Sequence, residues 1–184
     1  SYFFFLLSLQ TGTLGVFAAL DLVLFYIFWE AVLIPAYFLV ARWGGERRLY
    51  AALKFLLYTM AGSALMLVAI LALALLNQQA TGILTFDLQT LYDLPLPRLM
   101  QVWLFLAFVL AFAVKAPVWP LHTWLPDAYV ESPLPVTILL AAVLSKMGVY
   151  GLIRFCLPLF PDALAAFRPW LWVLAIIGIL YGSL

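Results

Sequence analysis

The chain has 184 residues, of which 68% are hydrophobic and 9% are charged, and its mean hydropathy is +1.16. A water-soluble domain has about 45–50% apolar and about 25% charged residues, so this composition excludes a soluble fold and leaves no room for a separate soluble domain. The net charge is +1 and the basic residues are dispersed, which argues against a nucleic-acid partner.

Six apolar segments follow one another along the chain, at residues 2–20, 22–41, 49–76, 99–116, 136–157 and 169–184. A helix needs about 20 mostly apolar residues to cross a bilayer, and barrel strands would alternate apolar and polar residues, which none of these segments does. The sequence therefore predicts an all-α, polytopic transmembrane helical bundle with about six spans in one domain over residues 1–184. Because Ser1 opens the chain and an apolar run closes it, we expect an internal fragment of a longer subunit.

The connections between the segments differ in charge. Around Asp21 the first two segments are predicted to form a tight hairpin. The connection at residues 42–48 carries three arginines, so the positive-inside rule predicts that it faces the cytoplasm. The connection at residues 77–98 carries Asp87 and Asp93 and suits the opposite side.

Four charged residues lie within the apolar segments: Glu30 near the middle of the second, Lys54 in the third, Lys115 at the end of the fourth and Lys146 near the middle of the fifth. A charge at the bilayer centre costs about 2.5–3.5 kcal/mol on insertion scales, so each position requires an explanation. Buried ion pairs that fix helix register are one explanation, and lysines that extend to an interface are another, open above all to Lys54. Glu30 and Lys146 are expected to face protein or a wet cavity.

Such a set of groups is also suited to moving protons. Desolvation disfavours the charged form of a carboxyl or an amine, whereas a neighbouring opposite charge favours it. A group held between these two influences gains or loses its proton when its neighbour moves. Glu30, Lys115 and Lys146 are therefore candidates for a proton relay.

The fourth segment is predicted to be a discontinuous helix between Lys115 and Pro126. In VKAPVWPLHTWLPDA, Pro117 and Pro120 each remove a helical hydrogen bond and clash with the preceding turn. A broken backbone is tolerated in the membrane only where protein or water satisfies the freed groups, and transporters place such breaks at ion sites. The break and Lys115 therefore support the same hypothesis.

Three more ionisable residues follow the break: His122, Asp127 and Glu131. His122 is the sole histidine, and it suits proton exchange or a hydrogen bond across the break. Asp127 and Glu131 are four residues apart and would share a helical face; with Lys54 they are possible relay or structural residues.

Covalent chemistry is not expected from this chain. The sequence has no dinucleotide-binding or phosphate-binding glycine motif, and we predict no catalytic residue, no metal ligands and no cofactor-binding residues. The lone cysteine, Cys156, cannot by itself form a disulfide, a zinc site or an iron–sulfur cluster, and is expected to be a small buried hydrophobe.

Five motifs in order resemble the proton-translocating, antiporter-like subunit M of bacterial respiratory complex I, the NADH:quinone oxidoreductase, which is chain 4 in mitochondria and chloroplasts. They are FWEAVLIPAYFL, RWGG with KFLLYTMAGSALML, FAVKAPVWPLHTWLPDA, LLAAVLSKMGVYGLIRF and LPLFP. The resemblance implies that the six segments are about helices four to nine of fourteen, including a discontinuous seventh, in a proton-pumping translocase.

The resemblance also implies roles for single residues. Glu30 would pair with Lys115, Lys146 would pass protons toward the centre of the membrane, and His122 would connect them, while the exit residue would lie on a later helix. NADH, FMN, iron–sulfur clusters and quinone would be bound by partner subunits, and the partners would be neighbouring antiporter-like chains of the membrane arm, in a bacterial inner membrane.

Some positions differ from the family pattern. Tyr129 stands where the family commonly has His, Leu134 where small residues run, and Ser145 where Leu is usual. A relay role for the loop at Tyr129 is therefore not expected. LSKMGVYGLIR would also fit a subunit of a multi-subunit Na⁺/H⁺ antiporter or of a membrane-bound hydrogenase, but FWE with LHTWLPDA favours complex I. A non-conducting membrane scaffold would require inert buried charges.

Overall fold

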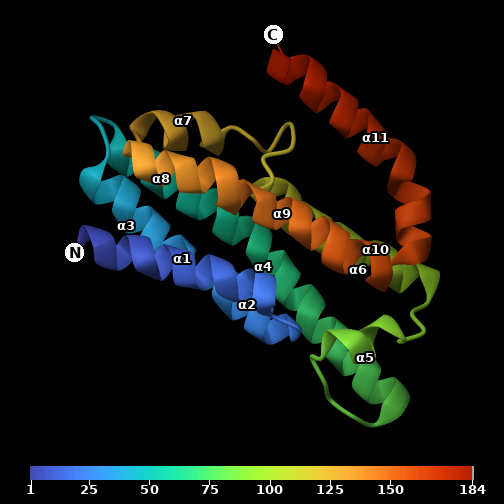
Figure 1. Cartoon of the computed structure of the whole chain (residues 1–184). Helices are drawn as coiled ribbons and strands as arrows, with labels where there is room; N and C mark the ends of the chain where they lie inside the picture. The colour runs from blue at the N-terminus through green and yellow to red at the C-terminus, as the bar shows by residue number, and fades with distance from the viewer. Residues whose placement is uncertain (184) are drawn as a thin grey trace.

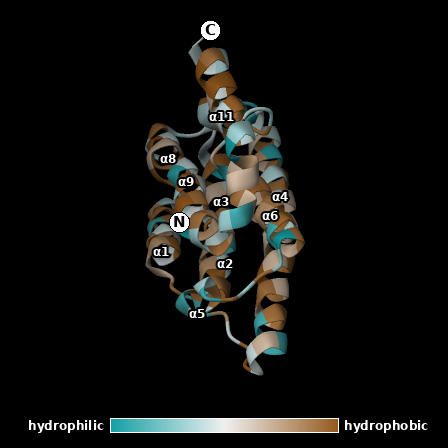
Figure 2. Cartoon of the chain, turned by 90° about the vertical axis from the view of Figure 1, so that its right-hand side faces the viewer, coloured by the Kyte–Doolittle hydropathy of each residue, from teal (hydrophilic) through white to brown (hydrophobic). Residues whose placement is uncertain are grey.

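The computed structural model describes residues 1–183, which form an all-helical bundle (Figure 1). Five helical stretches within these residues are long and apolar enough to cross a membrane, and the first segment forms a shorter apolar helix. The all-α prediction is confirmed. Many large apolar side chains are exposed, and residues of high hydropathy occur along all the long helices (Figure 2), as expected of a protein that spans a bilayer.

The first two segments form a helical hairpin. Helix α1 spans Tyr2–Ala18, and the second segment is divided into α2 (Leu22–Ala31) and α3 (Leu33–Trp43). Asp21 caps α2, because its carboxylate accepts hydrogen bonds from two backbone N–H groups of the first turn, both at 2.9 Å. The hairpin turn predicted at this residue is confirmed.

A local irregularity separates α2 from α3 at Val32. Pro35 has no N–H to donate to the carbonyl of Ala31, four residues earlier, and α2 ends at Ala31. Val32 keeps a right-handed helical backbone, and the two helices together form the single span predicted here, over Leu22–Trp43. The irregularity places Glu30 in the last turn of α2.

The long helix α4 spans Arg48–Thr81, with 34 residues against the 28 predicted over 49–76. It ends at Gly82, whose φ of 78° is the left-handed conformation that glycine adopts without a steric penalty. Its two ends carry the basic and the acidic connections, so these connections lie at opposite ends of the bundle, as predicted (Figure 1).

A short helix in the acidic connection, α5 (Leu88–Tyr92), was not predicted. It is joined to the first hairpin by an isolated antiparallel bridge between Asp21 and Asp87. The N–H of Leu22 donates to the carbonyl of Phe86, and the N–H of Leu88 donates to that of Leu20, both at 2.9 Å. The acidic connection is therefore fixed against the α1–α2 turn.

The predicted discontinuous helix is confirmed. Helix α6 spans Arg98–Lys115, residues 116–123 are not helical, and α7 resumes at Trp124–Glu131. The core lies where α4 packs against α6, α3 and α7. Beside it, four buried aromatic side chains of α2, α6 and η2 form a cluster in which neighbouring ring centroids are 4.4–6.3 Å apart: Phe25, Trp29, Phe112 and Phe155.

The fifth span, Leu134–Leu159, is not a uniform α-helix. It consists of α8 (Leu134–Leu139), π-helix η1 (Leu140–Leu144), α9 (Ser145–Gly151), π-helix η2 (Leu152–Cys156) and α10 (Leu157–Leu159). The two π-helical segments were not predicted, because apolar composition does not distinguish an i→i+5 turn from an α-helical one. Such turns are frequent at functional sites.

The last helix, α11, spans Pro161–Ser183 and begins eight residues before the predicted segment at 169. Proline is tolerated at the first helical position, where its missing N–H has no intrahelical partner. Gln101 of α6 holds the start of α11 by accepting from the N–H of Asp162 and donating to its carboxylate, both at 3.0 Å. Beyond this point α11 diverges from the bundle (Figures 1 and 2), and Ala163 is the one buried residue within its bounds.

Candidate functional site

Lys115 is the last residue of α6, and its side chain is buried with 1% exposure. Its Nζ lies 5.0 Å from the ring centroid of Trp29 and 5.9 Å from that of Phe55, and it has no hydrogen-bond partner among the described residues. The ring faces attract the ammonium but accept no proton from it. The aromatic cluster therefore isolates a titratable amine where the helix breaks.

Glu30 stands beside Trp29 in the last turn of α2. One carboxylate oxygen, Oε1, is buried and has no hydrogen-bond partner within residues 1–183. The ring of the preceding residue, Trp29, lies 5.0 Å from Nζ of Lys115. However, the side chains of Glu30 and Lys115 form no ion pair within 4.0 Å. Among the described residues the single ion pair joins Lys54 and Asp127. The structure brings Glu30 and Lys115 to one site without direct contact, and their pairing stays a prediction.

The backbone freed by the break is satisfied inside the protein. In a regular helix the N–H of Val118 would donate to the carbonyl of Val114, but here it donates to Ala113 at 2.9 Å. The indole Nε1 of Trp124, at the start of α7, donates to the carbonyl of Val114 at 2.9 Å instead. The buried side chain of Trp124 thus caps α6 and ties the two halves of the discontinuous helix together.

His122 lies in the non-helical segment between α6 and α7. Its Nδ1 is buried without a hydrogen-bond partner, so this atom makes no bond across the break. Its ring meets the ring of Tyr181 of α11 edge to face, at 5.2 Å between centroids. His122 follows Lys115 by seven residues, and its relay role stays a prediction.

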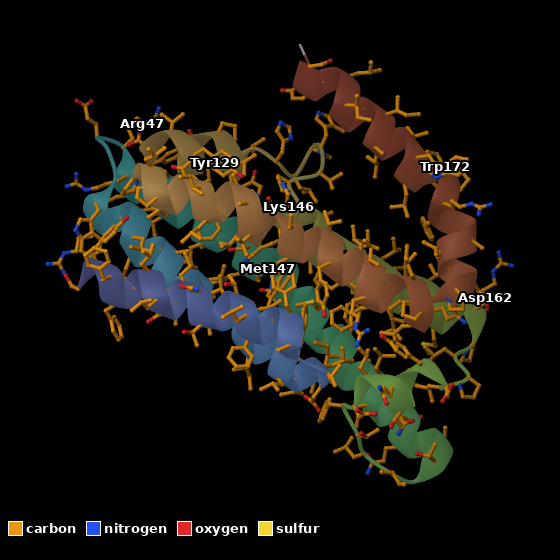
Figure 3. All side chains as sticks on the ribbon, in the orientation of Figure 1. Arg47, Tyr129, Lys146, Met147, Asp162 and Trp172 are labelled. Atoms are coloured by element: carbon orange, nitrogen blue, oxygen red, sulfur yellow. The ribbon has the colours of Figure 1, made fainter. Side chains whose placement is uncertain are left out.

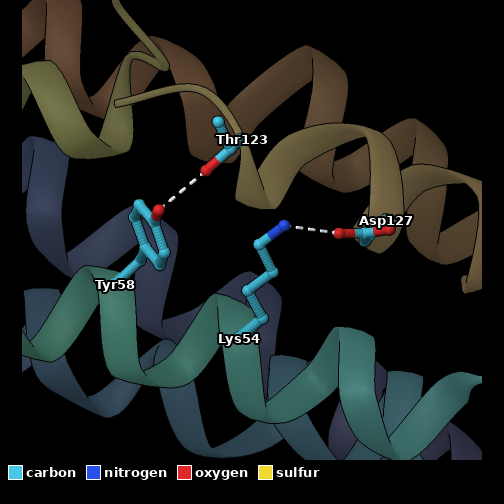
Figure 4. A network of polar contacts seen from close by, with 4 residues as sticks. All are labelled: Lys54, Tyr58, Thr123 and Asp127. Carbon is cyan, nitrogen blue, oxygen red and sulfur yellow. Dashed lines mark hydrogen bonds and ion pairs between the residues drawn. The ribbon is translucent and has the colours of Figure 1, made fainter. Parts of the chain in front are cut away.

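Lys54 and Asp127 form the ion pair just mentioned, with 2.7 Å between Nζ and Oδ2 and side-chain exposures of 21% and 30% (Figure 4). Tyr58 lies four residues after Lys54 on α4, and Thr123, directly before α7, lies four residues before Asp127; the hydroxyl of Thr123 donates to that of Tyr58 at 2.8 Å. Lys54 and Asp127 were both predicted as possible relay or structural residues, but their pairing was not predicted. The two equal spacings were the available signal, and it can be used only once α4 and α7 are known to be antiparallel neighbours.

Glu131 holds the basic loop. Its carbonyl accepts from the N–H of Gly45 and its Oε2 accepts from the N–H of Arg47, both at 2.9 Å. A Cβ atom at Gly44 or Gly45 would come within 2.7 Å of a Glu131 oxygen, so the glycine pair permits this close approach. Of the two roles considered for Glu131, these contacts support the structural one.

Lys146 lies apart from this site. It is exposed on the outer face of α9, and its Nζ donates to the carbonyl of Ala141 at 3.2 Å (Figure 3). The buried hydroxyl of Ser145 donates to the same carbonyl at 2.8 Å. The sequence analysis expected Lys146 to face protein or a wet cavity, whereas the described residues do not cover it. Cys156 is buried, as predicted.

Known proteins resemble this chain along almost its whole length. The profile of the NADH:quinone oxidoreductase/Mrp antiporter transmembrane family matches residues 19–184. NADH-quinone oxidoreductase subunit M of Pseudomonas aeruginosa is 50% identical over 97% of this chain and 36% of its own length. The chain thus spans about a third of the length of such curated relatives.

Two solved structures share the fold. A chain of respiratory complex I from Thermus thermophilus superposes with a TM-score of 0.89 and 40% identity, over 99% of this chain and 38% of that one. A chain of an archaeal membrane-bound sulfane sulfur reductase superposes with a TM-score of 0.73 and 32% identity, over 90% of this chain and 26% of that one. The predicted transmembrane bundle is thereby confirmed.

Proposed function

Because the chain belongs to the NADH:quinone oxidoreductase/Mrp antiporter transmembrane family, we propose that it is part of a subunit that moves protons across the membrane in an NADH:quinone oxidoreductase. The observation that carries the proposal is Lys115, a buried amine without a hydrogen-bond partner at a helix break, near a carboxylate that does not contact it. The identity to subunit M of Pseudomonas aeruginosa supports the same assignment.

The mechanism follows from the opposed influences on Lys115. Burial among aromatic rings disfavours the ammonium form, and the negative charge of Glu30 favours it. When Glu30 moves toward Lys115, the amine takes up a proton; when Glu30 withdraws, the ammonium releases it. His122 receives protons on the α7 side, and Lys146 carries them onward toward the centre of the membrane.

Electron transfer from NADH to quinone would take place in other subunits, which would hold FMN and the iron–sulfur clusters. The chain would occupy about helices four to nine of a fourteen-helix subunit, next to neighbouring antiporter-like chains of the membrane arm. The bacterial relatives support an inner-membrane location. Identity of 40% to a chain of complex I against 32% to a chain of the sulfane sulfur reductase supports complex I over a relative of the reductase kind.

The test uses the full-length parent protein in its assembled complex, with Glu30→Gln and Lys115→Ala made separately. We expect each variant to assemble and to lose proton pumping, by about 100-fold or more, because a proton-transfer group contributes on that scale. Pumping is measured in vesicles as acidification per NADH oxidised. The matched control is Arg98→Gln, which removes an exposed charge at the other end of α6.

Two results would overturn the proposal. Full pumping in both Glu30→Gln and Lys115→Ala would leave their charges inert, as in a non-conducting scaffold. Ion movement that requires sodium and proceeds without NADH oxidation would instead assign the chain to an antiporter.

A further inference from the structure

Arg154 is a cation within the fifth span that the proposed proton path does not use. It lies on η2, near the end of the span, and its carbonyl accepts a hydrogen bond from the hydroxyl of Tyr92 of α5 at 2.9 Å. Because α5 belongs to a connection between spans, this bond places Arg154 near the membrane edge, at the depth of lipid headgroups.

The guanidinium of Arg154 is uncompensated. Its Nε is buried and has no hydrogen-bond partner among residues 1–183, and the single ion pair of those residues lies elsewhere. Burial raises the pKa of the neighbouring Tyr92 hydroxyl, although the positive Arg154 opposes this, so the phenol stays neutral and supplies no balancing charge. A buried N–H donor without a partner indicates that an acceptor is missing.

A cavity of about 560 Å³ opens beside this side chain, lined by Tyr92, Tyr150, Ile153, Arg154, Leu157 and Pro158. A second cavity of about 280 Å³, almost wholly apolar, lies between α6, the end of the fifth span and α11. Ile153 and Leu157 line both cavities, so the cavity that holds the Arg154 guanidinium and the two tyrosines, mainly apolar apart from these groups, is continuous in its lining with the apolar cavity beside α11.

The polar groups of the first cavity define what fits there. The hydroxyl of Tyr92 already donates to Arg154, and that of Tyr150 donates to the carbonyl of Phe17 at 3.2 Å. Both phenol oxygens can therefore only accept, whereas the guanidinium can only donate. A ligand must offer an anion to Arg154, hydroxyl donors to the two tyrosines, and a hydrocarbon chain to the apolar cavity.

We propose that this pair of cavities binds one anionic phospholipid with a hydroxyl-bearing headgroup, of the phosphatidylglycerol class. Its phosphate contacts Arg154, because a guanidinium donates to phosphate oxygens with matching geometry. The headgroup hydroxyls donate to Tyr92 and Tyr150. One acyl chain passes Ile153 and Leu157 and fills the cavity beside α11.

The test measures lipid binding to the full-length parent in its assembled complex, purified in mild detergent. After delipidation, phosphatidylglycerol or phosphatidylcholine is added back and bound lipid is counted by native mass spectrometry. We expect tight binding of one phosphatidylglycerol, weaker binding of phosphatidylcholine, and about tenfold weaker phosphatidylglycerol binding in Arg154→Gln, because a charge-assisted contact is lost.

Arg168→Gln is the matched control, because Arg168 is exposed, stacks on Trp172 at 5.5 Å and lines neither cavity. It should bind lipid as the unaltered protein does. Ile153→Trp keeps the charge but obstructs the passage between the cavities, and it should also lose the lipid. This variant and the headgroup selectivity of the unaltered protein test the proposal even if Arg154→Gln fails to assemble.

Equal binding of the two lipids by the unaltered protein would overturn the proposal, as would undiminished binding in both Arg154→Gln and Ile153→Trp. If Arg168→Gln lost as much phosphatidylglycerol binding as Arg154→Gln, the lipid would be held by general attraction to the positive charges of the surface, which would also overturn the proposal. Crosslinking of Ile153→Cys to a protein segment rather than to lipid would show that another helix occupies the cavity. None of these results depends on proton pumping.

Discussion

Lys115 and Lys146 are both lysines of apolar segments, one at the end of α6 and the other in the middle of the fifth span, but their surroundings are opposite. Lys115 lies under Trp29 and Phe55 with 1% exposure and no hydrogen-bond acceptor. Lys146 is exposed and rests on a carbonyl of its own helix. The described residues surround Lys115 completely, whereas they cover only one side of Lys146.

This difference shows how much the sequence around a charged residue in an apolar segment reveals about its environment. Apolar neighbours in sequence show that a charge is costly, but the cost is met by partners from other helices. For Lys115 those partners come from α2 and α4. For Lys146 the described residues supply one backbone carbonyl and no counter-charge.

The largest effect is expected at Lys146, and the test asks whether proton pumping needs this lysine as well as Lys115. We expect Lys146→Ala in the full-length parent to leave the complex assembled and to lower proton pumping by about 100-fold, as a proton-transfer group would. Pumping and NADH:quinone electron transfer are measured together in vesicles. If both continue unchanged while Lys115→Ala abolishes pumping, Lys146 is structural and the two lysines do not share one path.

The contact between the two lysine-bearing helices can be tested at Gly148. A Cβ atom there would lie 2.5 Å from the carbonyl oxygen of Phe112 and 2.7 Å from the N–H nitrogen of Ala116, both backbone atoms beside the break. We expect Gly148→Ala to force α9 away from α6 and to destabilise the protein by about 1–3 kcal/mol. Thermal unfolding of the purified protein measures this.

Gly178→Ala is the control for this change, because nothing lies within 4 Å of its Cβ position on α11. It should be neutral or stabilising by up to about 1 kcal/mol, since alanine favours helix. Equal unfolding temperatures for the two variants would contradict the close packing of α9 on α6.

The smallest effect is expected at a carboxylate outside the spans. The backbone N–H and the hydroxyl of Thr90 hold the pKa of Asp87 below its ordinary value. The ionised group therefore stabilises the fold above the ordinary carboxyl pKa of about 3.9, and this contribution is lost as the pH falls through the lower folded-state pKa.

Asp87→Asn should keep the helix cap but remove that pH dependence. The unfolding temperatures of the two proteins would then differ more at pH 7 than at pH 3. A difference that does not change with pH would mean that the hydrogen bonds of Asp87 do not favour its ionised form.

Much of the architecture could be predicted from the sequence, because long apolar runs and paired prolines act locally. The break after Lys115 follows from Pro117 and Pro120, and the turn at Asp21 from a side chain that caps the next helix. The irregularity at Val32 was not predicted, because its cause, Pro35, is the third residue of the following helix and removes only the hydrogen bond to Ala31.

The unpredicted features depend on partners distant in sequence. Lys54 and Asp127 pair because α7 folds back along α4, and Glu131 reaches the loop at Gly45 for the same reason. Nothing near these residues in sequence specifies the register between the two helices. The π-helical segments of the fifth span likewise depend on how it packs against its neighbours.

The indole of Trp124 has a consequence for water. A broken helix in hydrocarbon needs protein or water to satisfy its backbone, and here the carbonyl of Val114 accepts from a tryptophan at the start of α7. Water is therefore not required for this hydrogen bond, and the cap on α6 does not depend on how wet the neighbourhood of Lys115 is.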